Sequence, residues 1–491
     1  MRRATTLTVF LVLIAATTAF TAEIPDRPEK LKFPELTFDV PDADSLRFEL
    51  KDGTPVYAKQ DTQFPLVNIA VYFRGGGYLE PAGKEGLAGI TGAAWRAGGA
   101  GDRTAQELDE ELDFLAANLG TNISDVYGSV SLNVLSKDLE AAMAIFMDVL
   151  TKPRFQQDRF DKAKDNLLQA MKQRNDDTAD IEAREWNRLI FGDDYWQNRL
   201  ATKAAVGAIT AGDSKAFVNS LVRSGNLVVA VAGDFEPAAL EALLNTTVGS
   251  LEPMAEPLPP IPQPDHTPEP GVYVVNKADV NQGRVSIGRP GFRQGYADQF
   301  PLMLGNDILG GYGFTARMMK RIRSDEGLAY SAYASLGFPV TIPGEFRAFF
   351  QSKSSTCAYA AEIFFRLLDD MRTTEATEEE IKTSKASFID TFPNQFASAA
   401  QVVGLYAIDE ILGRNHTFWV DYRDNVAAVS ADDVMKAMAK NLDPETMIML
   451  VVGNIEEIMK GHPEHDAKLT DFGEIKKVPL RDPMTLEPIT E

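Results

Sequence analysis

The fold is decided by the stretch Leu227-Val-Val-Ala-Val-Ala-Gly233, which recurs in the second half of the chain as Met447-Ile-Met-Leu-Val-Val-Gly453. A second pair precedes it at the same spacing, Ile209-Thr-Ala-Gly-Asp213 and Val429-Ser-Ala-Asp-Asp433. Each pair is typical of a capped helix followed by a buried strand that ends at glycine. Two matches at one offset, with no gap between them, predict an internal duplication.

A proline-rich stretch lies between the repeats. Residues 253–270 contain eight prolines, and proline fits neither a helix interior nor a central strand. This stretch is therefore predicted to be an extended linker. The predicted domains are residues 23–252 and 271–491, which are nearly equal in length.

Strands and helices are mixed within each half. Apolar alternation predicts strands over residues 66–73, 129–135, 271–276, 284–287 and 345–351. Helical spacing predicts helices over 104–119, 137–150, 158–174, 358–371 and 378–390. The pattern predicts an α+β fold built twice, as two homologous α/β sandwiches arranged like the halves of a clam.

The composition excludes several classes of function. The chain has 491 residues, 49 Lys and Arg, and 71 Asp and Glu, which gives a net charge of −22 without a basic cluster. Nucleic-acid binding needs clustered cations, so it is not expected. The negative charge favours basic peptides over acidic ones. The single cysteine, Cys357, lies in an apolar helical pattern and is predicted to be a buried small hydrophobe.

Histidine is scarce. The chain has only His266, His416, His462 and His465, so a site built entirely from residues before His266 cannot use imidazole. His462 and His465 flank Pro463, which predicts a surface loop rather than a metal site. His266 falls in the predicted linker, and His416 is isolated in the sequence.

The N-terminus is typical of an export signal. Arg2 and Arg3 precede an apolar stretch that is too short to span a bilayer, and small residues follow it up to Ala22. Residues 1–22 are predicted to be a signal peptide, and the periplasm is the expected destination. No membrane span is expected after the signal is removed.

Two motifs carry a family resemblance. The first is Phe73-Arg-Gly-Gly-Gly-Tyr-Leu-Glu-Pro-Ala-Gly-Lys-Glu-Gly-Leu-Ala88, which leads into a helix. The second is Arg323-Ser-Asp-Glu-Gly-Leu-Ala-Tyr330, which follows a glycine cluster at residues 310–313. Together they resemble the pitrilysin/insulinase zinc peptidases, which include the mitochondrial processing peptidase.

The resemblance implies that the zinc chemistry is missing from this chain. Active members carry His-x-x-Glu-His on the helix after the first motif, with two zinc-binding His, a Glu base, and a third ligand further along. The ligand positions fall here on Gly89, Ala93 and Ala170, and the base position on Gly92. No zinc is therefore expected in this chain. Gly86, Gly89 and Gly92 recur every third residue, which leaves two interpretations open: close approach of a peptide, or tight internal packing.

The second motif is intact. In the family, an Arg and a Tyr seven residues apart reach the zinc-bearing domain, and Arg323 and Tyr330 have this spacing. A Tyr hydroxyl can donate to an oxyanion, and an Arg can hold a carbonyl or carboxylate. The alternative without a functional role is that Tyr330 packs in the sheet while Arg323 is a solvated charge at a helix end.

The resemblance therefore implies the zinc-less subunit of an exported heterodimeric peptidase. A same-family partner would carry His-x-x-Glu-His and the zinc, and Arg323 and Tyr330 would act in trans on a peptide bound as an added strand in the partner. The chain alone is expected to be inactive. The alternatives are a non-enzymatic scaffold and a pseudo-peptidase that binds peptides without cutting them.

Overall fold

The computed structural model describes residues 27, 30–31, 37–311 and 313–489. The predicted signal peptide, residues 1–22, lies outside the described residues. Residues Val40–Glu491 form one compact unit, and the elements named below belong to it.

The first half of the unit contains its first sheet. Its elements are α1 (Ala43–Leu46), β1 (Arg47–Glu49), β2 (Pro55–Gln60), β3 (Leu66–Arg74), η2 (Gly77–Leu79), α2 (Leu87–Trp95), α3 (Ala105–Phe114), β4 (Asn118–Ile123), β5 (Tyr127–Leu135), η3 (Ser136–Asp138), α4 (Leu139–Thr151), α5 (Gln157–Lys172), α6 (Thr178–Phe191), η4 (Trp196–Asn198), α7 (Lys203–Ala208), α8 (Ala211–Leu221), β6 (Leu227–Gly233), α9 (Pro237–Thr246) and η5 (Val248–Ser250).

The second half contains the second sheet. Its elements are β7 (Gly271–Asn276), β8 (Gln282–Pro290), α10 (Gln299–Gly310), η6 (Met319–Asp325), β9 (Ala329–Leu336), β10 (Glu345–Lys353), η7 (Ser354–Thr356), α11 (Cys357–Thr373), α12 (Glu378–Thr391), η8 (Phe392–Phe396), α13 (Ala399–Leu412), α14 (Thr417–Ala428), α15 (Ala431–Asn441), η9 (Pro444–Thr446), β11 (Ile448–Gly453), α16 (Ile455–Ile458), η10 (Leu469–Phe472) and β12 (Ile475–Lys477).

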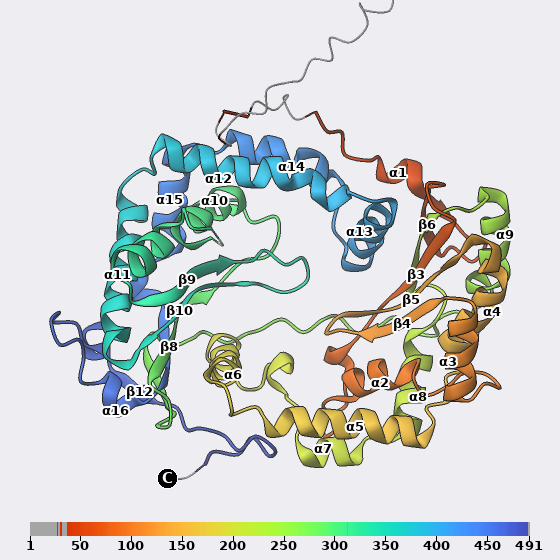
Figure 1. Ribbon diagram of the computed structural model, residues 1–491, viewed down its shortest axis with the longest axis horizontal. Coiled ribbons are helices and arrows are strands. Elements are labelled where there is room, and N and C mark those ends of the chain that lie inside the picture. The colour runs from red at the N-terminus through yellow and green to blue at the C-terminus, as the bar shows by residue number, and fades with distance from the viewer. Residues whose placement is uncertain (1–26, 28–29, 32–36, 312, 490–491) are drawn as a thin grey trace, which may run out of the picture. The chain divides into compact units, whose positions relative to one another are not determined.

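The two sheets share one topology apart from an outermost strand (Figure 1). Their strand orders are β1-β2-β6-β3-β5-β4 and β12-β7-β11-β8-β10-β9. In each sheet the repeated strand, β6 or β11, runs parallel to the strand on one side and antiparallel to the strand on the other. The repeated helices α8 and α15 begin with equivalent capping boxes, Thr210 with Asp213 and Ser430 with Asp433. The predicted duplicated α+β fold is confirmed.

Most predicted elements are confirmed to within a few residues at each end. The exception is the helix expected over residues 104–119, because α3 ends at Phe114 and β4 begins at Asn118. The chain reverses at Ala116, whose φ is 48°, and the Ala117 amide donates to the Leu112 carbonyl to close the turn. The predicted domain boundaries remain a prediction. Residues 251–270 contain no helix or strand.

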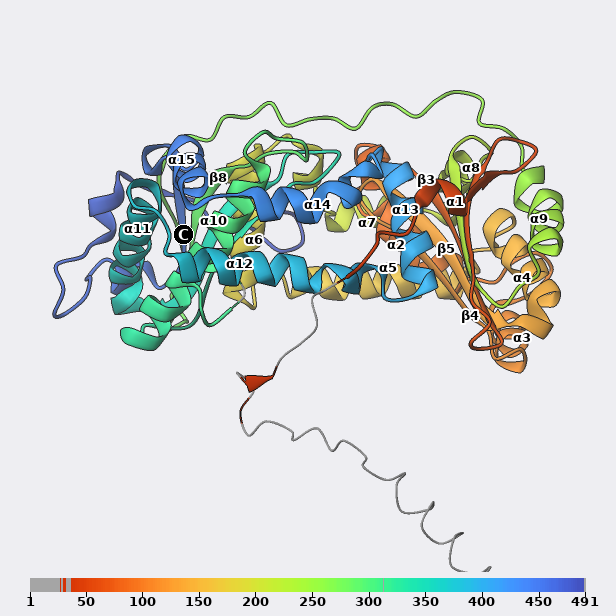
Figure 2. The same ribbon diagram turned by 90° about the horizontal axis from the view of Figure 1, so that it is seen from above.

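Each half places one helix on the sheet of the other half (Figures 1 and 2). Helix α6 of the first half packs Ile181, Trp186 and Ile190 against the buried strand β11 of the second sheet. Helix α13 of the second half covers β6, β2 and β3 of the first sheet. The two exchanged helices explain why β6 and β11 are buried on both faces.

Each exchanged helix also brings one glutamate to arginines of the opposite sheet. Glu182 of α6, which has no exposed surface, accepts hydrogen bonds from Arg284, Arg347 and Ser286. Glu410 of α13 accepts from Arg47 at 2.9 and 3.1 Å. These polar contacts therefore fix the position of each exchanged helix on the opposite sheet.

The C-terminal segment returns to the first half after β12. The Lys203 amide donates to the Met484 carbonyl at 2.8 Å, and the Arg174 side chain donates to the Pro483 carbonyl at 3.1 Å. Met484 packs against the core of the first half. Residues 478–489 therefore join the halves as a strap.

The histidines and the cysteine agree with their predicted structural roles, apart from His416. Cys357 is fully buried, and burial raises the pKa of its thiol to about 12. His465 stacks on Tyr359 within a loop. His416 is not isolated in space, because its Nε2 lies 2.9 Å from the Tyr57 hydroxyl of the opposite half.

Candidate functional site

Helix α2 carries two of the three predicted ligand positions, Gly89 and Ala93, and the predicted position of the base, Gly92. The helix begins after Gly86, whose φ of 99° places it in the left-handed region that favours glycine. Glu80 caps the helix by accepting hydrogen bonds from the Gly86 and Ala88 amides at 3.0 and 2.7 Å. Burial raises the pKa of the Glu80 carboxyl, and these two bonds partly offset the rise. The start of the helix is thus well defined.

The three ligand positions lie on the exposed faces of two helices in contact. Gly89 and Ala93 are exposed on α2, Ala170 is exposed on α5, and α2 packs against α5. None of the three side chains offers an atom that could bind a metal. Among the described residues, no group of three His, Cys, Asp or Glu side chains comes together as a metal site.

The glycines of α2 serve different purposes. A Cβ on Gly89 would meet no atom within 4 Å, whereas a Cβ on Gly92 would lie 3.1 Å from the Ile123 amide nitrogen of β4. The Thr121 hydroxyl also donates to the Gly92 carbonyl at 2.9 Å. Of the two interpretations of the glycine repeat, tight packing applies to Gly92, and Gly89 is left as bare, open backbone.

We expect Gly89→Ala to raise the free energy of unfolding by about 0.5–1 kcal/mol, because it restores helix propensity in open space. Gly92→Val should lower the free energy of unfolding by about 1–3 kcal/mol, because its methyl groups would press on β4. Urea titration of both variants measures the two effects. A loss of stability in Gly89→Ala would contradict this assignment.

The second motif forms an exposed stack of one cation and two aromatic rings. The Arg323 guanidinium lies 4.9 Å from the centre of the Tyr330 ring and 4.7 Å from the centre of the Phe314 ring. Tyr330 is 84% exposed and Phe314 is 72% exposed. Both rings therefore face solvent, and neither aromatic is a core residue. Tyr330 therefore does not pack in the sheet interior, as the alternative without a functional role required.

Local backbone geometry creates this stack. The η6 helix, which has π-helical hydrogen bonding, ends when the Gly327 amide donates to the Arg323 carbonyl at 3.1 Å. Gly327 has a φ of 63°, which glycine adopts without strain. The chain then enters β9, whose pairing with β10 is irregular beside Tyr330, between Phe350 and Ser352. Bulges of this kind redirect side chains at sheet edges.

The charge of Arg323 is left available. No acidic residue in the described part of the chain pairs with Arg323, although the chain has an excess of acids. A guanidinium held by two rings loses little freedom when it binds a carbonyl or carboxylate. The stack is therefore suited to contact with a peptide.

Arg317, at the start of the helical segment that carries Arg323, is anchored by Glu380 of α12. The Arg317 fork donates to both carboxylate oxygens of Glu380, at 2.7 and 2.9 Å. This pairing, with smaller contributions from the hydrogen bonds of Thr377, lowers the pKa of Glu380 from 4.5 to about 2. The anchor holds in place the segment between Phe314 and Arg323.

The anchor gives the stability a defined pH dependence. Because the pKa of Glu380 is depressed on folding, its stabilisation is complete above pH 4.5 and is lost as the pH falls towards 2. Glu380→Gln should therefore be less stable than the wild type at pH 7, and the difference should shrink over this window. Thermal melts at pH 7, 4 and 2.5 test it, and a constant difference would contradict it.

Sequence reasoning placed Arg323 and Tyr330 together but assigned no role to Phe314. Phe314 is one of several aromatic residues near glycines, and no spacing rule connects it to Arg323. The edge strand β4 was also missed, since its first residues were assigned to a helix. β4 and β9 are the outermost strands of their sheets, a position open to strand addition.

Fold and site together define a peptidase scaffold with two homologous halves. Residues 56–191 match the model of the insulinase family, peptidase family M16, and residues 208–388 match the M16 inactive domain. Together these matches cover more than half of the chain. The chain belongs to the pitrilysin/insulinase (M16) family, as a member without the zinc ligands and the base.

Individual relatives agree with this assignment. The non-peptidase homologue YmxG of Helicobacter pylori is 26% identical over 69% of this chain and 78% of its own length. The M16 inactive domain structure from Pseudomonas fluorescens has a TM-score of 0.74 at 21% identity, covering 83% of this chain and 97% of that one. The periplasmic protease PqqL of Escherichia coli has a TM-score of 0.70 at 16% identity, over 83% of this chain and 45% of PqqL.

Among the described residues, no helix combines the length and the apolar character needed to cross a membrane.

Proposed function

We propose that the chain is the zinc-less subunit of an exported heterodimeric peptidase. It supplies Arg323 and Tyr330 to the zinc site of a same-family partner that carries His-x-x-Glu-His. The observation that carries the proposal is the exposed stack in which the guanidinium lies 4.9 Å from the Tyr330 ring and has no acidic partner within the described residues. A purely structural role does not require an arginine without an acidic partner between two solvent-exposed rings.

In this proposal the partner's zinc supplies the activated water, and this chain's residues act on the peptide. The Tyr330 hydroxyl donates to the oxygen of the scissile carbonyl as negative charge develops there. Arg323 holds a neighbouring carbonyl or carboxylate of the peptide through its fork of donors. The substrate lies extended and adds a strand to a sheet edge of the partner.

Export is part of the proposal. The sequence of residues 1–22 supports it, and the likeness to a periplasmic protease agrees with it. Detection of the mature chain in the periplasmic fraction, cut after Ala19 or Ala22, is the expected result. Retention of an uncut chain in the cytosol would contradict export.

The catalytic proposal is tested by expressing the chain alone and together with a chain of the same family, encoded in the same genome, that carries His-x-x-Glu-His. We expect no stoichiometric zinc and no peptide cleavage by the chain alone, and both in the purified pair. Zinc or turnover in the isolated chain would overturn the proposal.

A non-enzymatic role is the second candidate, favoured by the likeness to a non-peptidase homologue. Under that reading the pair binds peptides or assembles without cleaving them. Peptide binding by the pair without turnover would establish it in place of the peptidase role.

A further inference from the structure

A pocket of about 640 Å³ lies beside the Arg323 stack, between α10, η6 and α12. Phe314 belongs to both features, since its ring covers Arg323 and also lines the pocket. A group held in the pocket is therefore next to any peptide that contacts Arg323 and Tyr330. The volume is within the range of pockets that bind small ligands or side chains.

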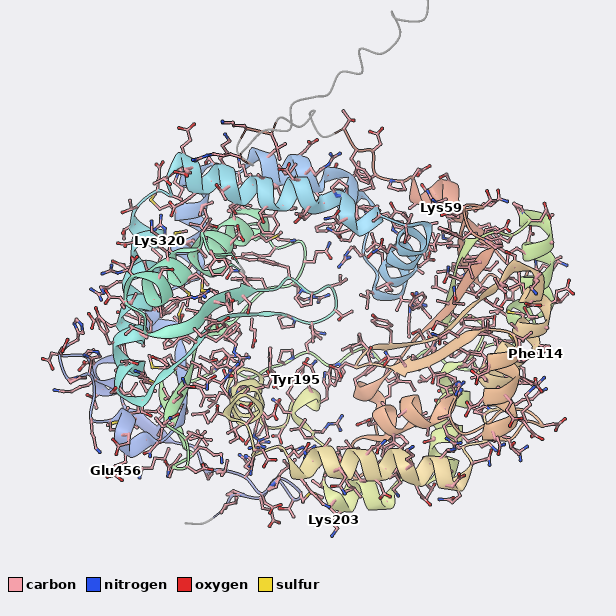
Figure 3. The ribbon with its side chains drawn as sticks, in the orientation of Figure 1. Lys59, Phe114, Tyr195, Lys203, Lys320 and Glu456 are labelled. Carbon is pink, nitrogen blue, oxygen red and sulfur yellow. The ribbon has the colours of Figure 1, made fainter. Side chains whose placement is uncertain are left out.

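Most charges that line the pocket are already neutralised. Arg317 pairs with Glu380, and Arg321 pairs with Glu326 at 3.0 Å and with Asp325 at 3.4 Å. Lys320 and Glu379 have exposed side chains, and Figure 3 labels Lys320. The charge that remains inside the pocket is Asp307, which is half-buried.

Asp307 is an anion without a cation partner among the described residues. It lies in the last turn of α10, where the helix dipole disfavours a negative charge. Burial raises the pKa of its carboxyl, and a hydrogen bond with Ser384 partly offsets the rise. A half-buried acid in a pocket, without a cation to pair with, is typical of a binding site.

The backbone next to Asp307 keeps space for its carboxylate. Gly311 follows α10, and a Cβ on Gly311 would collide with the Asp307 carboxylate oxygen Oδ1. Apolar side chains, Ile308, Phe314 and Leu367, line the same pocket. The pocket thus combines one acid with apolar walls, which suits a long aliphatic chain that ends in a cation.

We propose that this pocket receives a lysine or arginine side chain of the bound peptide, with Asp307 as its counter-ion. The proposal rests on the peptide-binding role given above and adds the class of substrate. The stem of the basic side chain packs on Phe314, which at the same time positions Arg323. The excess of acidic residues in the chain draws basic peptides towards the site.

The test uses two fluorescent ten-residue peptides that differ at one position, lysine against uncharged norleucine. Binding to the full chain is measured by anisotropy. A charged hydrogen bond of this kind predicts a preference for lysine of about 10- to 100-fold, and Asp307→Asn should reduce the preference to less than about 3-fold. The melting temperature of Asp307→Asn should equal or exceed that of the wild type, so the loss is not unfolding.

The matched control is Asp370→Asn, which makes the same charge change at an exposed position of α11 outside the pocket. It should keep the full preference for lysine. Equal binding of the two peptides, binding of neither peptide, or an unchanged preference in Asp307→Asn would overturn the proposal. Peptide cleavage by the pair is measured separately. Cleavage without a preference for lysine would overturn only the proposed role of the pocket, whereas a preference for lysine without cleavage would overturn only the proposed peptidase function.

Discussion

Tyr330→Phe is expected to lower kcat of the assembled pair by about 10²–10³-fold, the usual cost of losing one oxyanion donor. The ring stays in place under this change, because its contact with Arg323 uses the ring face and not the hydroxyl. KM should therefore change little, and kcat and kcat/KM should fall together, as for an interaction made only in the transition state. Steady-state kinetics on one fluorogenic peptide measures both constants.

Arg323→Ala should lower kcat/KM by a similar factor, with a larger share in KM, since the guanidinium holds the peptide in the ground state as well. Arg323→Lys keeps the charge and loses the fork, and we expect it to recover only part of the activity.

Two controls separate chemistry from structure. Tyr273→Phe removes a hydroxyl that donates to the Glu269 carbonyl, and Arg366→Ala removes an exposed cation of α11. Both should leave turnover within about 2-fold of the wild type, because surface substitutions away from a site usually have small effects. Unchanged turnover in both Tyr330→Phe and Arg323→Ala, in a pair that still assembles, would defeat the assigned roles.

The duplication and the candidate pair could be predicted from the sequence because both depend on spacing. One constant offset relates the strands that begin at Leu227 and Met447 in the sequence, and these strands occupy equivalent places in the two sheets. The path from Arg323 to Tyr330 runs through a helix end, a left-handed glycine and a strand start, and this local path brings the two side chains together. Local geometry of this kind is determined by the types and order of neighbouring residues, so it can be predicted from the sequence.

The helix exchange could not be predicted, because periodicity shows that a helix buries one face without showing which surface covers it. Helix α6 follows the elements of its own half but packs on β8 and β11 of the other. For the same reason Glu182 looks like an ordinary helix-surface charge in the sequence, whereas it is fully buried. Asp307 and Phe314 were missed likewise, since their surroundings come from α12 and η6.

Glu182→Ala is expected to lower the free energy of unfolding by about 3–5 kcal/mol, because removing one partner of a buried ion pair leaves uncompensated charge. The substitution removes the carboxylate that Arg284 and Arg347 share, and it leaves Arg347 with only the longer ion pair to Glu345, at 3.9 Å, within the described residues. Arg347 also lies over Trp186, 5.2 Å from its ring, and the Trp186 indole donates to Glu345 at 2.7 Å. The substitution should therefore loosen the contact of α6 with the second sheet. Urea titration followed by tryptophan fluorescence reports both effects.

Asp180→Ala removes an exposed acid from the first turn of the same helix and is the matched control; it should lower the free energy of unfolding by no more than about 1 kcal/mol, the usual effect of a charge at a helix end. Glu182→Gln should fall between the two, because an amide can still accept from Arg284 but carries no charge to balance the arginines. If Glu182→Ala cost less than about 1 kcal/mol, the buried network would not be what fixes the exchanged helix. The apolar contacts of Ile181, Trp186 and Ile190 with β11 would then carry the exchange alone.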